Sequence, residues 1–160
     1  MVNMNSSAYP IKKLIGLENI FITEYKEKND FLNFFIDKGM NIPGIINREE
    51  IANAVFKREE LMSTGIGLSI AVPHVRIGTV KDLNVFIAIN TFDIMDYKSL
   101  DDQPVRIGVF IVVGKDQHSE YVKALSVIVE RLKNSSIRER LLKAESENDI
   151  YNCIIQEVAR

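Results

Sequence analysis

Two largely apolar runs, residues 83–89 and 105–113, lie in the middle of the chain. A strand that faces water on one side alternates between apolar and polar residues, and these runs do not alternate. Continuous apolar strands are typical of sheets that are covered on both faces. The pattern therefore predicts an α/β fold in which helices pack on both faces of a small sheet of about four strands.

Helices are predicted on either side of these strands. Asn47 and Glu50 have the spacing of a capping box and predict a helix that ends near Leu61. Ser136 and Ser146, each followed three residues later by an acidic residue, predict two further helix starts. The apolar spacing elsewhere predicts a strand over 19–25, a helix over 31–39, a helix over 119–132 and a final helix that buries Ile150, Ile154 and Val158.

Composition narrows the class of protein. A chain of 160 residues with 46% hydrophobic and 26% charged residues is typical of a globular protein, and we expect a single domain over 1–160. A net charge of −2 provides no basic field for nucleic acid. No apolar run is long enough to cross a bilayer, and residues 1–10, which we expect to be flexible, lack the apolar core of a secretory signal.

Cysteine and histidine are scarce. Cys153 is the only cysteine, so an internal disulfide is excluded and a reducing compartment is favoured. One cysteine and two histidines also argue against a structural zinc site. We therefore expect a cytoplasmic domain that holds no metal.

The segment over 63–74 reads STGIGLSIAVPH and predicts a glycine-bearing turn over 64–67 and a strand over 68–75. Pro73 fixes its own φ and keeps the preceding residue extended, so His74 lies just beyond a rigid joint. A neutral imidazole has a free lone pair near pH 7 and can be phosphorylated on nitrogen. Local chemistry alone leaves a phosphoryl acceptor and a satisfied core histidine as alternatives.

Other residues could hold an anion beside His74. His118 stands where a predicted helix begins, and a helix N-terminus favours anions, although local chemistry favours an exposed helix-start residue. Arg58 and Arg76 could each neutralise a dianion or could be solvated surface charges. Gly65 and Gly67 could let backbone N–H groups approach a phosphate, but they match neither the P-loop nor the dinucleotide fingerprint.

Several motifs stand in a fixed order along the chain. They are Leu-Glu-Asn-Ile from residue 17, Lys-Arg-Glu-Glu-Leu from 57, Ser-Thr-Gly-Ile-Gly from 63, Ile-Ala-Val-Pro-His from 70, Leu-Asp-Asp-Gln-Pro-Val from 100, His118 with the helix after it, and Leu-Leu-Lys-Ala from 141. Together they resemble the type-2 IIA component of the bacterial phosphoenolpyruvate-dependent sugar phosphotransferase system, the fructose/mannitol class that includes the nitrogen-branch IIA protein. This resemblance covers nearly the whole chain and implies an α/β sandwich around a mixed sheet.

The resemblance implies a role for each site residue. His74 would accept the phosphoryl group, Arg58 would lie at the active site, and His118 would assist at the phosphoryl group. Thr64 and the residues after it, among them the two glycines, would line the same pocket, and Arg76 is our further candidate there. The donor would be the phosphorylated histidine phosphocarrier protein and the receiver a IIB component, with no metal or organic cofactor at this step.

The chain departs from the family pattern at a few positions. Leu68 stands where the family usually has a polar residue, and Ser69 stands where the family often has a glycine. Three roles therefore stay open: a sugar-uptake component, a regulatory phosphoprotein of the nitrogen-branch type that controls partner proteins, and a degenerate binding module that no longer accepts phosphate. In the first two roles we expect partners to dock on a shallow apolar patch around the acceptor, formed by Leu68, Val75 and Ile77.

Overall fold

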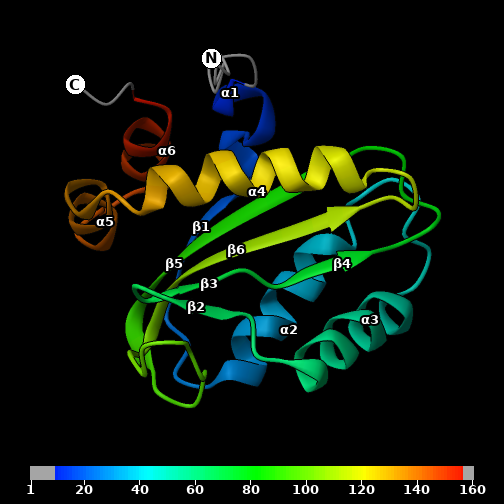
Figure 1. Ribbon diagram of the computed structural model, residues 1–160, viewed down its shortest axis with the longest axis horizontal. Coiled ribbons are helices and arrows are strands. Elements are labelled where there is room, and N and C mark those ends of the chain that lie inside the picture. Colours follow the sequence, from blue (N-terminus) through cyan, green and yellow to red (C-terminus); the bar gives the residue numbers. More distant parts are fainter. Residues whose placement is uncertain (1–9, 157–160) are drawn as a thin grey trace, which may run out of the picture.

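The computed structural model describes residues 10–156 (Figure 1). The expected flexible segment over 1–10 lies, except for Pro10, outside the described residues, as does Val158. The elements in chain order are α1 (Ile11–Leu14), the 3-10 turn η2 (Leu17–Asn19), β1 (Ile20–Thr23), α2 (Lys28–Gly39), α3 (Arg48–Leu61), β2 (Gly65–Gly67), β3 (Ile70–Ala71), β4 (His74–Arg76), β5 (Asn84–Ile94), β6 (Val105–Val113), α4 (His118–Leu132), α5 (Ser135–Leu142) and α6 (Glu147–Ile155).

The described strands form one mixed sheet of six strands, in the order β1-β5-β6-β3-β2, with β4 also paired to β6. β1 runs parallel to β5, and β5 runs antiparallel to β6. β3 and β4 are successive pieces that both run parallel to β6. The sheet has more strands than the expected four because the predicted strand over 68–75 is divided and because the glycine segment before it is itself a strand.

Two apolar cores sandwich this sheet. Along β5, Val85, Ile87 and Ile89 point into a core shared with α1, α4, α5 and α6, whereas Phe86 and Ala88 point into a core shared with α2 and α3. Each of these side chains is at most 3% exposed. Full burial of each larger apolar side chain stabilises the fold by about 2 kcal/mol. The predicted α/β class, with helices on both faces, is confirmed, and Figure 1 shows α4 and α2 on opposite sides of the sheet.

Helix starts follow their capping residues. The Asn47 and Ser146 side chains each accept a hydrogen bond from a backbone N–H three residues further on, so these two predicted caps are confirmed. The helix predicted near Ser136 is present, but Ser136 is not its cap, since α5 begins at Ser135 and Asn134 provides the cap. Asn134 has the extended backbone that is typical of a capping residue, and its side-chain oxygen accepts a hydrogen bond from the N–H of Ile137.

The segment before His74 differs from its prediction. The glycines that predict a turn form strand β2 instead, and the chain reverses at Leu68 and Ser69, whose φ angles are +57° and +64°. Gly67 pairs with Ile70 across this two-residue loop, so β2 and β3 form a tight hairpin. The strand then breaks after β3, where Pro73 has no N–H to donate, and β4 begins at His74.

Candidate active site

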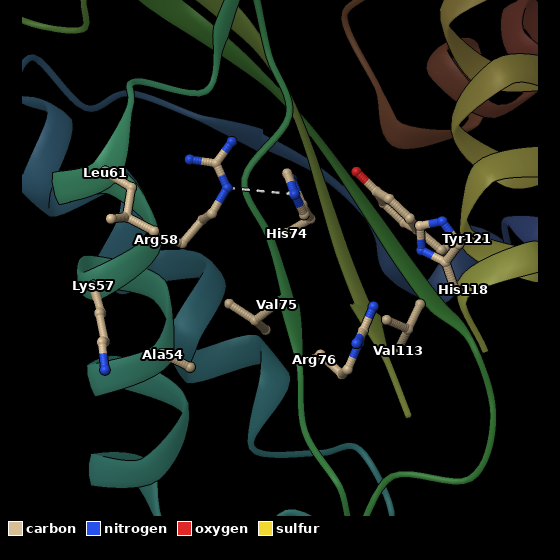
Figure 2. A pocket seen from close by; sticks show the side chains of 10 residues that line it. All are labelled: Ala54, Lys57, Arg58, Leu61, His74, Val75, Arg76, Val113, His118 and Tyr121. Atoms are coloured by element: carbon tan, nitrogen blue, oxygen red, sulfur yellow. Dashed lines mark hydrogen bonds between the residues drawn. The ribbon is translucent and has the colours of Figure 1, made fainter. Parts of the chain in front are cut away.

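His74 is the first residue of β4 and is held by backbone hydrogen bonds on its N-terminal side. The Pro73 carbonyl accepts a hydrogen bond from the Ile111 N–H at 3.1 Å, within the central strand β6. The Val72 N–H donates to the Thr64 carbonyl at 2.9 Å. The imidazole is half-buried and opens on a cleft between α3, β4 and α4 (Figure 2). The backbone therefore presents this ring from a rigid position.

The contacts of His74 assign its two ring nitrogens. Nδ1 lies 3.0 Å from the Val72 carbonyl oxygen, and because a carbonyl only accepts hydrogen bonds, Nδ1 carries the proton. Nε2 is then left with a lone pair, toward which the Arg58 Nε–H donates at 3.4 Å. Arg58 is itself held by a hydrogen bond from Nη1 to the Met62 carbonyl at 2.7 Å. The nucleophilic nitrogen is therefore Nε2, and it faces a guanidinium.

The surroundings of His74 keep its ring neutral. Burial lowers the pKa of His74 below its ordinary value of 6.5, because a charged ring loses its hydration there. The hydrogen bond to the Val72 carbonyl opposes this shift, the Arg58 charge adds to it, and the Glu59 charge opposes it. At pH 7 the imidazole is therefore in its nucleophilic form.

The cleft beside His74 has a volume of about 460 Å³ and is cationic. Its lining residues are Ala54, Lys57, Arg58 and Leu61 of α3, His74, Val75 and Arg76 of β4, Val113 of β6, and His118 and Tyr121 of α4. Among these residues, all in the described part of the chain, none is acidic. Three side chains with permanent positive charge therefore face a site that could receive a dianion.

Two α4 residues complete the cleft. His118 is exposed and begins α4, next to the free N–H groups of the first turn. The Tyr121 ring stacks on the His74 imidazole, with centroids 5.0 Å apart and planes at 28°, and its centroid is 6.4 Å from that of His118. Sequence patterns predict Tyr121 only as part of an apolar helix face. Tyr121 follows His118 by three residues, so both lie on one side of the helix. This spacing is the feature of the sequence that could have indicated Tyr121 as a cleft residue.

The structure brings His74, Arg58, His118 and Arg76 to one cleft but leaves the other expected pocket residues outside its lining. The Thr64 side chain is buried and shares a hydrogen bond of 2.6 Å with the Tyr97 hydroxyl. Gly65 passes so close to the loop after β5 that a Cβ would lie 2.2 Å from the Lys98 carbonyl oxygen. Gly67, with a φ of +96°, faces Asp101. These glycines thus shape the β2–β3 hairpin.

The predicted docking patch is wrong in two of its three residues. Val75 and Ile77 are only 6% and 3% exposed, because alternate residues from β4 onward point into the core beneath α2 and α3. Leu68 is 44% exposed but lies in the hairpin loop, outside the cleft lining. Exposed apolar surface near Arg58 comes instead from the end of α3, where Leu61 is 79% and Met62 66% exposed.

Residues 10–156 contain no helix long and apolar enough to cross a bilayer. In the same residues, no three His, Cys, Asp or Glu side chains gather in a way that could hold a metal ion. The histidines of the cleft are instead accompanied by cationic and aromatic side chains.

The fold and the cleft define an α/β sandwich protein that presents a neutral imidazole to a guanidinium. The family model described as phosphoenolpyruvate-dependent sugar phosphotransferase system, EIIA 2, matches residues 13–157. The chain therefore belongs to this family, and the resemblance in its sequence is confirmed.

Relatives in the family differ in their described roles. The chain is 34% identical over 134 residues to the fructose-specific EIIABC component of Bacillus subtilis. The matched region covers 83% of this chain but only 21% of that protein. The chain is 26% identical over 146 residues to the fructose-specific EIIA component of Haloferax volcanii, covering 91% and 92% of the two chains. It is 33% identical over 106 residues to the nitrogen regulatory protein of Escherichia coli, covering 65% and 64%.

Solved structures share the fold. The nitrogen regulatory protein IIA-Ntr of Neisseria meningitidis superposes with a TM-score of 0.79 at 23% identity, over 90% of this chain and 98% of that one. The IIA mannitol protein of Escherichia coli superposes with a TM-score of 0.70 at 24% identity, over 88% and 98%. At these identities the likeness shows a common architecture.

Proposed function

We propose that this protein is a phosphoryl carrier that accepts a phosphoryl group on His74 Nε2 from the phosphorylated histidine phosphocarrier protein and passes it to a IIB component. The observation that carries the proposal is the free lone pair of Nε2, which faces Arg58 in a cationic cleft. Family membership supports phosphoryl transfer in general. A solved complex of the Escherichia coli IIA mannitol protein with phosphorylated IIB mannitol supports the choice of receiver.

The transfer step needs little covalent chemistry from the protein. The Nε2 lone pair attacks phosphorus in line, while the bond between phosphorus and the donor's histidine nitrogen breaks and that nitrogen keeps the electron pair. No proton has to leave Nε2, because the ring proton is on Nδ1. The Val72 carbonyl accepts a hydrogen bond from Nδ1–H before, during and after the transfer. This hydrogen bond stabilises the positive charge that the ring gains.

Cationic groups stabilise the transferred phosphoryl group. Arg58 donates to Nε2 in the free protein, so its guanidinium is within reach of phosphoryl oxygens once Nε2 has bonded to phosphorus. His118 and the first N–H groups of α4 lie on the opposite side of the cleft. Lys57 and Arg76 add positive charge at the cleft. Such preorganised donors lower the barrier to phosphoryl transfer.

Donor and receiver must dock in turn on the face that exposes Nε2. Leu61 and Met62 provide exposed apolar surface at that face, beside the cationic Lys57. An apolar contact bordered by positive charge suits a donor that carries a phosphohistidine. In this role the protein works in the cytoplasm, in agreement with its single cysteine.

The test is reconstitution with phosphoenolpyruvate and the general phosphotransferase proteins, read by intact mass. We expect the native protein to gain one phosphoryl group and the His74→Ala variant to gain none. His118→Ala is the matched control, because it removes a neighbouring imidazole and leaves the acceptor, so it should be labelled more slowly but completely. Full labelling of His74→Ala would place the acceptor elsewhere.

A regulatory role is the second candidate, and the identity to the Escherichia coli nitrogen regulatory protein favours it. The two roles share the acceptance step and differ in the fate of the phosphoryl group. Rapid transfer from phosphorylated protein to a IIB component indicates sugar uptake, and a long-lived phosphoprotein indicates regulation. If the native protein gained no phosphoryl group, the degenerate binding module suggested by Leu68 would be supported instead.

A further inference from the structure

Tyr121 is an aromatic side chain of the cleft that the transfer step described above does not use. It lies in the first turn of α4 and is half-buried. The residues that anchor α4 on the sheet lie further along the helix and are at most 1% exposed: Ala124, Ile128 and Leu132. Tyr121 therefore sits at the rim of this core, where its ring reaches the acceptor imidazole (Figure 2).

The two hydrogen bonds of the His74 ring act at its edge. Nδ1 is bonded to the Val72 carbonyl at 3.0 Å, and Nε2 receives a long contact of 3.4 Å from Arg58. Hydrogen bonds in the plane of the ring restrain its tilt less than a contact on its face does. Tyr121 provides that face contact, with the two planes 28° apart. A contact on the face of the ring opposes tilting, and tilting would change the direction of the Nε2 lone pair.

The stack becomes stronger as the reaction proceeds. While Nε2 bonds to phosphorus, Nδ1 keeps its proton, so the imidazole gains positive charge. A cation is attracted to the face of a tyrosine ring, whereas the neutral imidazole of the free protein lacks this attraction. An interaction that is stronger in the transition state than in the ground state increases the rate of the chemical step.

We propose that Tyr121 is a positioning residue for phosphoryl transfer, whose ring fixes the plane of the His74 imidazole and stabilises the charge that this imidazole gains. The proposal rests on the proposed function of His74 as acceptor. One bond between nitrogen and phosphorus forms as another breaks, so no further reactant is needed. The role belongs to the aromatic ring and not to the hydroxyl group, and phenylalanine should therefore replace tyrosine.

The test compares Tyr121→Phe, Tyr121→Leu and the control Val122→Ala, an exposed neighbour on α4 that does not line the cleft. Rates of transfer from the phosphorylated phosphocarrier protein are measured against donor concentration. We expect Tyr121→Leu to lose about tenfold in maximal rate with an unchanged KM, and the other two variants to stay within about twofold of the native protein. Thermal unfolding checks that all variants are folded.

A second readout needs no phosphoryl donor. Nitrogen NMR shifts of His74 report which ring nitrogen carries the proton, and we expect a single Nδ1–H form in the native protein and in Tyr121→Phe. In Tyr121→Leu we expect a mixture of both forms, because a ring that is free to tilt leaves the direction of the Val72 carbonyl and weakens the hydrogen bond that keeps the proton on Nδ1. A native rate and a single form in Tyr121→Leu, or an equal loss in Tyr121→Phe, would overturn the proposal. If the native protein took no phosphoryl group, the proposed function would fail, while the NMR arm would still decide the positioning of the ring.

Discussion

At the scale of single residues, the protonation of His74 is set by its burial and its neighbours. Because burial and the Arg58 charge lower the pKa of His74, we expect an NMR titration midpoint below 6.5 and a higher midpoint in Arg58→Met. Stability from the neutral ring is complete above pH 6.5 and is lost as the pH falls through the folded-state pKa. Resonances that vanish in His74→Ala identify the group. A native midpoint above 6.5 would contradict this account.

Glu59, the neighbour of Arg58, offers a second residue-scale prediction. Its side chain is only 5% exposed and is paired with Lys28, whose Nζ lies 3.0 Å from Oε1. Lys28→Met leaves a buried carboxylate unpaired, so we expect a loss of about 3 kcal/mol in the free energy of unfolding. Arg48→Met is the control, because it breaks an exposed ion pair with Asp37 and should cost less than about 1 kcal/mol. Urea unfolding measures both, and equal losses would refute the expectation.

At the scale of elements, the β2–β3 hairpin carries backbone strain. Leu68 and Ser69 both have positive φ, a conformation that costs a residue with a Cβ about 1 kcal/mol. The turn persists because the Asp101 carboxylate accepts a hydrogen bond from the Leu68 N–H at 2.8 Å. This distant partner explains why the sequence misplaces the turn: Gly65 and Gly67 carry the usual turn signal, and nothing local marks the residues that form it.

This strain predicts a stabilising substitution. Ser69→Gly should raise the free energy of unfolding by about 1 kcal/mol, since glycine adopts positive φ without a steric penalty. Ser119→Gly is the matched control, because Ser119 lies in α4 with helical backbone and the same change should lower stability there. Urea denaturation with unchanged slopes would measure both. A loss of stability in Ser69→Gly would show that the Ser69 side chain contributes more than its backbone costs.

At the scale of the whole molecule, the sequence predicts the sheet, its coverage and most helix starts, because these follow from local apolar spacing and capping. Local sequence patterns do not predict the cleft, since Arg58, His74 and His118 lie on three elements that only the tertiary structure brings together. The family resemblance provides that grouping. The error at Val75 has the same origin: local sequence does not tell which face of a strand is covered, and β4 turns Val75 toward α2 and α3.

The docking face gives the prediction at this scale. Leu61→Ser should raise the KM for the phosphorylated phosphocarrier protein about tenfold, because an exposed apolar anchor beside the cleft is lost, and should leave stability unchanged. Ile46→Ser is the control, since Ile46 is equally exposed, at 80%, but precedes α3 at its other end. Steady-state transfer kinetics measure both variants. An unchanged KM in Leu61→Ser, or the same increase in Ile46→Ser, would mean that the donor docks elsewhere.

The most direct measurement is NMR of the nitrogen-labelled protein after phosphorylation by its donor, which shows the atom that carries phosphorus. The account predicts one phosphorus coupling, to Nε2 of His74, with the proton retained on Nδ1. Phosphorus on Nδ1 of this ring, on His118 or on any other side chain would contradict it.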